Sequence, residues 1–167
     1  MENDSYVVYI DGKCINEIKK AYAIALFDRK CGENNRYYWE GDDSTNNIAE
    51  YMGVIIALEN LPESSTAEIR TDSQLVYGQL VLGWKVNYAH LFDLINRIEQ
   101  LISKKKLGIT YVQIPREENV SDIVLNRHLR KISLMSLGET DRKRIEELEK
   151  KKSEILCELK NLYSKLK

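Results

Sequence analysis

Hydrophobic and polar positions repeat with two different periods along the first 138 residues, and the changes of period predict the order of the elements. Short runs of β-branched, aromatic and small apolar residues predict buried strands. These runs are Tyr6–Ile10, Ala21–Phe27, Tyr37–Trp39, Ala67–Thr71 and Ile109–Ile114. Apolar residues at three- and four-residue spacing predict helices instead. The predicted helices cover about Asn47–Asn60, Ser73–Leu82, Ala89–Ser103 and Asn119–Leu137.

This order of elements predicts an α/β fold with a mixed sheet. The first three strands have only short connections, which favours antiparallel neighbours. The last two strands are separated from the others by helices, which favours parallel additions whose faces the helices cover. We therefore expect residues 1–138 to form one layered domain.

Residues 139–167 have a different pattern, because their aliphatic side chains recur with the seven-residue period of a coiled coil. Six of them fall on the a and d positions of this repeat: Ile145, Leu148, Ile155, Leu159, Leu162 and Leu166. Lys152 occupies one further a position. Such a seam needs a partner surface. The sequence leaves three partners open: a second copy in a homodimer, the preceding domain, or another protein.

Composition and charge exclude several classes of protein. A hydrophobic content of 43% is sufficient for a packed core and argues against disorder. The net charge of −1 excludes binding of nucleic acid through bulk charge alone. Cys14, Cys31 and Cys157 form no CxxC pair, which argues against a zinc site or a disulfide framework. No run approaches the roughly 20 apolar residues of a membrane span, and the acidic start is unlike a signal peptide. We expect a cytoplasmic protein with no membrane partner.

Four carboxylates occupy positions from which they could converge. Asp11 and Asp72 each directly follow a predicted strand, and sites in α/β sheets form beyond the carboxyl ends of strands. Glu50 lies about one turn into the first helix, and Asp122 lies near the start of the last domain helix. Each acid taken singly is more often a turn or cap residue. Only the four together, in this context, indicate a site.

Several motifs give the chain a resemblance to a known family. They are YIDG (9–12), STNNIAEYMGVIIALENL (44–61), IRTDSQLVYGQL (69–80), GWKV (83–86) and VQIPREENVSDIVLNRHL (112–129). In this order they resemble the ribonuclease H type 1 family, in particular its reverse-transcriptase-like branch. The resemblance implies a five-stranded mixed sheet of strand order 3-2-1-4-5, flanked by helices.

The resemblance also implies a metal-dependent activity. Asp11 is similar to the family acid that bridges two metal ions, and Glu50, Asp72 and Asp122 are similar to the other three acids. Two Mg²⁺ ions, or Mn²⁺ as a substitute, would offset the charge of a phosphodiester and activate water. The expected reaction cuts the RNA strand of an RNA–DNA hybrid and leaves a 3′-hydroxyl and a 5′-phosphate.

Residues that would contact the hybrid follow from the same resemblance. Thr45, Asn46, Asn47 and Gln74 resemble minor-groove contacts, where the 2′-hydroxyl distinguishes RNA from DNA. Asn16 is the one polar residue retained from the family loop after the first acid, and Trp84 with Lys85 resembles a motif beside the DNA strand. Alternatives stay open: Thr45 and Asn46 could cap a helix, Ser73 could cap the next one, and Trp84 could be a core residue.

The chain departs from the family pattern in three places. Lys13 stands where relatives have a small residue, and the usual glycine- and proline-rich loop after Asp11 is missing. Asn119 precedes Asp122 by three residues instead of four. The family histidine before the last acid is absent, so Glu118, or Glu117, is a candidate auxiliary group that shuttles metal or protons. The alternative is that both glutamates belong to a solvated loop.

Three functions remain after this comparison. The first is the metal-dependent endoribonuclease. The second is a non-catalytic or repurposed ribonuclease H-like module that binds nucleic acid and is recruited through its C-terminal helix, which the altered first loop favours. The third is a related nuclease acting on double-stranded RNA or DNA. Cleavage of a hybrid, and its dependence on metal and on the 2′-hydroxyl, separates the three.

Overall fold

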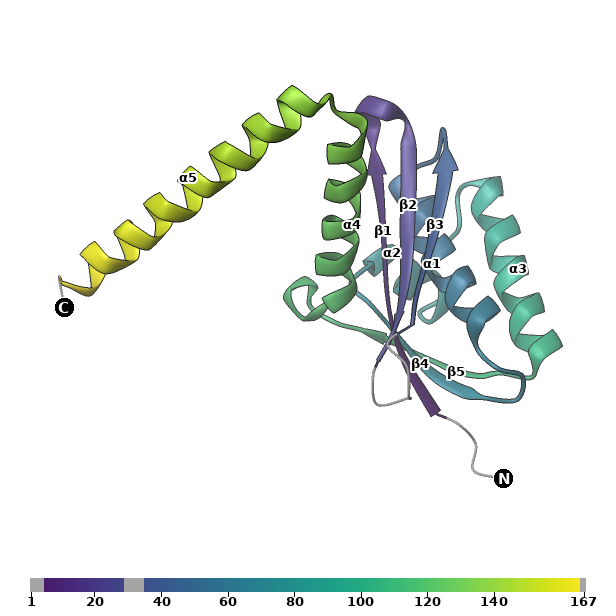
Figure 1. Cartoon of the computed structure of the whole chain (residues 1–167). Coiled ribbons are helices and arrows are strands. Elements are labelled where there is room, and N and C mark those ends of the chain that lie inside the picture. Colours follow the sequence, from purple (N-terminus) through teal and green to yellow (C-terminus); the bar gives the residue numbers. More distant parts are fainter. Residues whose placement is uncertain (1–4, 29–34, 166–167) are drawn as a thin grey trace. The chain divides into compact units, whose positions relative to one another are not determined.

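The computed structural model describes residues 5–28 and 35–165, and it contains every strand and helix that the sequence predicts (Figure 1). The strands are β1 Ser5–Ile15, β2 Lys20–Phe27, β3 Arg36–Asp42, β4 Thr66–Thr71 and β5 Gly108–Gln113. The helices are α1 Asn46–Asn60, α2 Gln74–Leu80, α3 Ala89–Lys105, α4 Val120–Ser136 and α5 Glu139–Ser164. Short 3-10 helices cover Asn16–Ile18 and Arg116–Glu118.

The five strands form one mixed sheet in the order β3-β2-β1-β4-β5, which confirms the predicted topology. Strand β2 runs antiparallel to both β1 and β3, whereas β4 runs parallel to β1 and β5 runs parallel to β4. The parallel pairs are adjacent strands separated in sequence by helices, as crossover connections require. The central strand β1 therefore has an antiparallel neighbour on one side and a parallel neighbour on the other.

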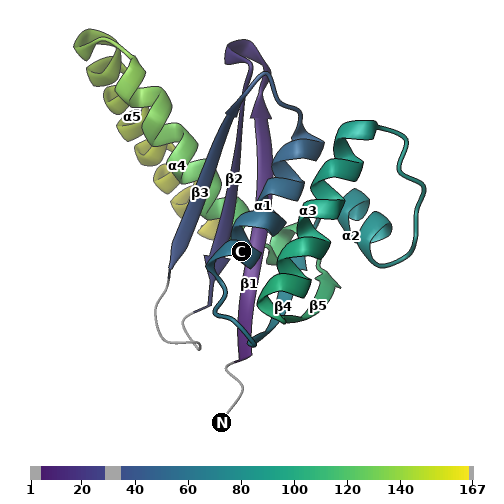
Figure 2. The same ribbon diagram turned by 90° about the vertical axis from the view of Figure 1, so that its right-hand side faces the viewer.

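Helix α1 packs on one face of the sheet, with α3 beside it (Figure 2). Nearly every turn of α1 is buried, and Tyr51, Ile55 and Leu58 are fully enclosed. Alternate residues of β2 divide between the two faces of the sheet. Ala23 and Phe27 belong to the core beneath α1, whereas the intervening Ile24 lies outside that cluster and is still fully buried. Both faces of the central sheet are thus covered.

Capping contacts fix the ends of the helices around this core. The hydroxyl of Thr45 accepts a hydrogen bond from the Ile48 amide at 3.3 Å, and that of Ser73 accepts one from the Val76 amide at 3.4 Å. Capping by both residues is therefore confirmed. The Lys105 ammonium donates to the carbonyl oxygens of Leu58 and Glu59 at 2.9 and 2.8 Å, so this lysine caps the C-terminal end of α1 from the neighbouring helix.

The end of the first strand was predicted wrongly. Strand β1 does not end at Ile10 but continues to Ile15, so Asp11 lies within the strand and not after it. The extension forms because residues 11–15 pair antiparallel with residues 20–24 of β2. The connection is the 3-10 turn at Asn16–Ile18, closed by Lys19 with a φ of 53°. Hairpin pairing thus replaces the glycine- and proline-rich loop of the family pattern.

The chain divides into two compact units, Met1–Asn126 and Arg127–Lys167. In the second unit, Arg142 donates to the carbonyl oxygens of Met135 and Leu137 at 2.6 and 2.9 Å, which ties the start of α5 to the end of α4. Four of the predicted seam residues are exposed: Leu148, Ile155, Leu159 and Leu162. Leu166, the last of the seam, lies outside the described residues.

Two expectations about the chain as a whole can be compared with the described residues. Cys14 and Cys157 are free thiols, as predicted, and Cys31 lies outside the described residues. Within residues 5–28 and 35–165, every helix is too short or too polar to cross a membrane.

Candidate active site

The parallel pairing of β1 with β4 brings the first two predicted acids together. Ser5 pairs with Thr66 and Tyr9 pairs with Arg70, so each residue of β1 faces the residue 61 positions later. The same register, continued by two residues, places Asp11 beside Asp72, which directly follows β4. The side chain of Asn119 connects the two strands here. Its Nδ2 donates to the Ile10 carbonyl at 2.9 Å and to Asp72 Oδ1 at 2.6 Å.

A close approach between β1 and α1 brings in the third acid. A Cβ atom on Gly12 would lie 2.3 Å from both the Ala49 carbonyl carbon and the Glu50 nitrogen. Glycine at this position therefore lets the strand touch the first turns of α1. As a result, Glu50 lies close enough to Asp11 and Asp72 for their charges to raise its pKa.

Replacing Gly12 by alanine is expected to lower the free energy of unfolding by about 3 kcal/mol, because the added methyl group meets backbone atoms that cannot rotate away. Urea unfolding followed by circular dichroism measures the change. Gly138→Ala is the matched control, since the nearest atom to its added Cβ is Asp141 Oδ2 at 4.0 Å. Equal stability of the two variants would contradict the close packing of β1 against α1.

Asp11 and Glu50 carry buried oxygen atoms that lack a hydrogen-bond partner. These atoms are Asp11 Oδ2 and Glu50 Oε2. Burial, with the neighbouring charges of Asp122 and Asp72, raises the pKa of Asp11 to about 7 even though Lys13 opposes the shift. Burial, with the charges of Asp11 and Asp72, raises the pKa of Glu50 to about 9. Each of the two groups thus retains a buried oxygen whose capacity to accept a hydrogen bond or a cation is unused.

The fourth acid, Asp122, lies in the first turn of α4 and is surrounded by donors. Lys13 Nζ donates to its Oδ1 at 2.6 Å, and Arg116 Nη2 contacts the same oxygen at 3.2 Å. Asn126 Nδ2, one helical turn later, donates to Oδ2 at 2.8 Å. Burial alone would raise the pKa of Asp122, but the bonds and charges of Lys13 and Arg116 outweigh it and lower that pKa.

The four predicted acids therefore meet in one region but differ in their surroundings. Asp11 and Glu50 are short of donors, Asp72 is held by an amide, and Asp122 is held by two cationic side chains. Among residues 5–28 and 35–165, no three Asp, Glu, His or Cys side chains are arranged closely enough to hold one metal ion as they stand. A shared metal site thus stays a prediction, for which the donor set and the unpartnered oxygens are suited.

Comparison with known proteins assigns this arrangement to a family. The family model described as RNase H matches residues 3–115, which is more than half of the chain. The chain belongs to the RNase H family. Members of this family generally depend on divalent metal.

Curated relatives and solved structures agree with the assignment. Ribonuclease H of Schizosaccharomyces pombe is 32% identical over 126 residues, covering 66% of this chain and 47% of that protein. A bifunctional protein of Mycobacterium tuberculosis is 35% identical over 78 residues, covering 46% of this chain and 21% of that protein. The chain thus spans less than half the length of these relatives.

The N-terminal RNase H domain of an M. tuberculosis protein, solved as a fusion with maltose-binding protein, superposes with a TM-score of 0.62 at 27% identity. The match covers 71% of this chain and 88% of that one. LC11-RNase H1 in complex with an RNA/DNA hybrid gives a TM-score of 0.61 at 25% identity, covering 70% of this chain and 89% of that chain. These likenesses confirm the RNase H fold of the sheet and its helices.

Four of the predicted hybrid-contacting residues of this RNase H chain are exposed and lie close to Glu50 or Asp72 along the sequence. Thr45 caps α1, and Asn46 and Asn47 form its exposed first turn, so the three residues lie three to five positions before Glu50. Asn46 Oδ1 accepts a hydrogen bond from the Cys14 amide at 2.6 Å. Asn46 is therefore committed to the β1 hairpin and is not the cap of α1. Gln74 is exposed and lines a shallow depression together with Asp72 and Arg116.

The remaining predicted residues lie further along the same unit. Asn16 is exposed in the 3-10 turn, and its Oδ1 accepts from Cys14 Sγ at 3.3 Å. Trp84 is 48% exposed and its ring covers Gly78. The alternative prediction that Trp84 is a core residue is therefore wrong. Lys85 is exposed next to it. Glu118 is exposed in the 3-10 turn before α4.

Four further residues contact the RNase H acids and were not predicted as site residues: Lys13, Arg116, Asn119 and Asn126. Two of them had a signal in the sequence. Lys13 is two residues from Asp11 and so shares its face of a strand, and Asn126 is four residues from Asp122 and so shares its face of a helix. Asn119 had a place in the family motif before Asp122, but its contacts with Asp72 and the Ile10 carbonyl had no signal. The contact of Arg116 with Asp122 had none either, because both sets depend on the path of the chain between β5 and α4.

Proposed function

We propose that this chain cleaves the RNA strand of RNA–DNA hybrids by metal-dependent hydrolysis, leaving a 3′-hydroxyl and a 5′-phosphate. The observation that carries the proposal is the junction of Asp11, Glu50 and Asp72, in which buried carboxylate oxygens lack partners. Clustered acids repel one another and are held together at a cost in stability unless a cation joins them. The RNA/DNA hybrid bound by LC11-RNase H1 supports the choice of substrate.

Asp11, Glu50, Asp72 and Asp122 are the residues that would hold divalent metal, with Mg²⁺ favoured by their hard oxygen donors and Mn²⁺ as a substitute. Two such ions, when bound, would offset the charge of the phosphodiester and activate the attacking water. The protein itself orients the acids. Asn119 fixes one oxygen of Asp72, and Asn126 fixes one oxygen of Asp122. Each of these amides binds one oxygen of the carboxylate and does not contact the other.

Discrimination between RNA and DNA is assigned to the polar start of α1 and to the residue after Asp72. Asn46 and Gln74 are the stronger candidates for sensing the 2′-hydroxyl, with Thr45, Asn47 and Asn16 beside them. Both stronger candidates are exposed. Trp84, half-exposed on Gly78, offers an aromatic surface to the DNA strand. Glu118 stands as an auxiliary acid that could move protons or metal near Asp122.

A labelled 20-base-pair hybrid tests the proposal directly, on the order of two turns of duplex. The full chain with Mg²⁺ or Mn²⁺ is expected to shorten the labelled RNA strand, and a chelator is expected to stop the reaction. All-DNA and all-RNA duplexes of the same sequence are expected to stay intact. An uncut hybrid with either metal would sink the proposal, and cleavage of either homoduplex would favour a nuclease of different substrate class.

A binding module without catalysis is the second candidate, and one observation favours it. Lys13 occupies a position against Asp122 and near Asp11, so part of the acid cluster is already neutralised by the chain itself. Such a module would bind a hybrid without metal. Gel-shift binding that persists in chelator and survives Asp72→Asn, with no cleavage, would support this candidate over the first.

We propose further that residues 139–167 form a separate segment that pairs with a second copy of the chain through the heptad seam. The exposed aliphatic side chains of α5 support this proposal, since Leu148, Ile155 and Leu162 are each about half-exposed or more (49%, 57% and 58%). The alternatives are a partner protein and the domain of residues 1–138.

Removal of residues 139–167 is expected to convert the dimer into a monomer, because the seam between the two copies is lost. Multi-angle light scattering of the full chain and of a version ending at Gly138 measures the change. Leu159→Lys in the full chain is the milder variant, and Lys160→Glu, one position outside the seam, is its control. A monomeric full chain would contradict the homodimer.

A further inference from the structure

Lys13 is the less exposed of the two cationic side chains that contact Asp122; the other, Arg116, is 69% exposed. Lys13 lies two residues after Asp11 on β1, so the two side chains extend from the same face of the strand. Its Nζ is 2.6 Å from Asp122 Oδ1, 2.6 Å from Asn126 Oδ1 and 3.7 Å from Asp11 Oδ2. The lysine side chain is 21% exposed and the two carboxylates are 4% and 16% exposed, so these contacts are shielded from solvent.

The opposite side of the cluster has no comparable contact. Glu50 Oε2 is buried without a hydrogen-bond partner. Asp11 Oδ2, which belongs to both sides, lies 3.7 Å from the lysine but likewise accepts no hydrogen bond. Asp72 accepts its hydrogen bond from the neutral amide of Asn119. The cluster therefore consists of one half that contains a cation and one half that has acceptor atoms to spare.

We propose that the Lys13 ammonium acts as a built-in cation on the Asp11–Asp122 side of the metal site. One divalent ion then enters on the side of Asp11, Glu50 and Asp72 while the lysine stays in place. A second ion binds only when the lysine leaves, so the second site is the weaker one. This inference rests on the proposed metal-dependent function and assigns Lys13 as a positioning residue that sets metal affinity.

Electrostatics give the direction of the effect. A divalent ion placed beside Asp122 would meet a positive charge within a few ångströms, in a region shielded from water where such repulsion is strong. It would also have to break the hydrogen bond of Lys13 to Asn126, which holds the lysine from the neutral side. Removing the ammonium while keeping an unbranched side chain eliminates the repulsion from Lys13 and its bond to Asn126, and leaves beside Asp122 the more exposed guanidinium of Arg116. The same change leaves the metal-free acids without their internal counter-charge.

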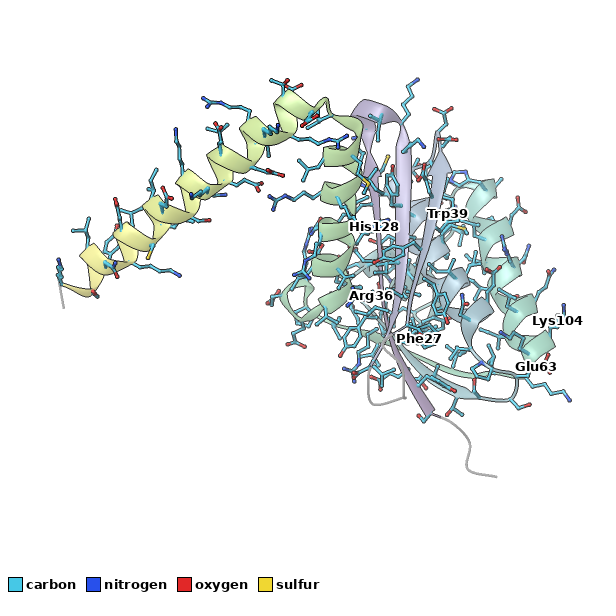
Figure 3. The ribbon with its side chains drawn as sticks, in the orientation of Figure 1. Phe27, Arg36, Trp39, Glu63, Lys104 and His128 are labelled. Atoms are coloured by element: carbon cyan, nitrogen blue, oxygen red, sulfur yellow. The ribbon has the colours of Figure 1, made fainter. Side chains whose placement is uncertain are left out.

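The test compares Lys13→Met with the wild type and with Lys104→Met, in the full chain. Methionine keeps an unbranched side chain and removes the charge. Lys104 is an exposed lysine that extends outward from the last turn of α3, so Lys104→Met removes the same charge away from the acids (Figure 3). Free Mn²⁺ is measured by electron paramagnetic resonance as the metal is titrated into each protein.

The wild type and Lys104→Met are expected to bind one Mn²⁺ ion more tightly than a second. Lys13→Met is expected to bind the weaker ion about tenfold more tightly or better, since a nearby unit charge is removed from a shielded site. Lys13→Arg keeps the charge and is expected to resemble the wild type. Coincident titration curves for Lys13→Met and the wild type would overturn the inference, as would two equally tight ions in the wild type.

Thermal unfolding supplies a second readout. In chelator, Lys13→Met is expected to melt below the wild type, and saturating Mn²⁺ is expected to raise its melting temperature by more. An equal rise in both proteins would contradict the inference. The hybrid assay keeps the two proposals apart: if the hybrid is cut but the titrations coincide, only the role of Lys13 fails. If the titrations differ as expected but no hybrid is cut, the proposed reaction fails and the built-in cation stands.

Discussion

Asp72→Asn is expected to lower the rate of hybrid cleavage by about a thousandfold or more, because it removes a negative charge from the proposed metal site without removing its side chain. The fold should survive this change. Asn119 Nδ2 donates to Asp72 Oδ1 at 2.6 Å, and an asparagine at this position still offers an amide oxygen to accept that bond. The relaxed repulsion between the remaining acids favours the folded state further.

Single-turnover cleavage of the labelled hybrid measures the loss, and circular dichroism with thermal melting tests the fold. Asp93→Asn is the matched control, since Asp93 is an exposed carboxylate on α3 and the change is chemically the same. Asp93→Asn is expected to cut at the wild-type rate. If Asp72→Asn remained within about tenfold of that rate, the proposed role of Asp72 at the metal site would be wrong.

Glu50→Gln is expected to stabilise the metal-free protein at pH 8 by on the order of 3 kcal/mol. Burial, with the charges of Asp11 and Asp72, raises the pKa of Glu50 from 4.5 to about 9. The folded protein therefore holds a proton that the unfolded chain releases as pH rises above about 4.5. The contribution of protonated Glu50 to the free energy of unfolding is complete below that pH and is lost progressively up to about pH 9. Glutamine mimics the protonated state at every pH.

The same reasoning applies to Asp11, whose pKa rises from 3.8 to about 7, so its contribution is lost between those values. In chelator, the free energy of unfolding of the wild type should fall between pH 5 and pH 8, and Glu50→Gln should flatten the decline. Added Mg²⁺ should stabilise the wild type more at pH 8 than at pH 5, because metal binds the deprotonated acids. Urea unfolding across this range measures each effect.

Glu99→Gln, an exposed change on α3, is the control for this series and should follow the wild type at every pH. A wild-type protein that became more stable in chelator as pH rose from 5 to 8 would contradict the burial of the acids. So would a Glu50→Gln protein less stable than the wild type at pH 8.

The fold could be predicted because each element has a strong local pattern. Alternation and apolar runs located all five strands, and the three- and four-residue spacing of Ile48, Met52 and Ile55 located α1 to within a residue. The end of β1 was missed because its last residues, KCI, have no strand pattern of their own. They are extended only because β2 lies beside them and supplies hydrogen bonds. Tertiary pairing of this kind has no local signature.

The site was predictable in its acids and not in their partners. Asp11, Glu50, Asp72 and Asp122 stand in motifs, and the structure brings them into one region. Lys13 was noticed only as a departure from the family pattern. Its contact with Asp122 joins residues 109 positions apart and depends on where α4 begins. Contacts across such a separation follow from packing and from the course of the loops, which the sequence pattern does not contain.

The parallel register of β1 and β4 fixes the relative position of Asp11 and Asp72. The register begins at the pair Ser5 and Thr66. Because each residue of β1 is aligned with the residue 61 positions later, the two carboxylates are adjacent although they are far apart in the sequence. Inserting or deleting one residue ahead of Asp11 inside β1 would turn that side chain to the opposite face of the sheet. Among related sequences, we therefore expect insertions and deletions in the connection between α2 and α3 and not in β1 or β4, whose register aligns the acids.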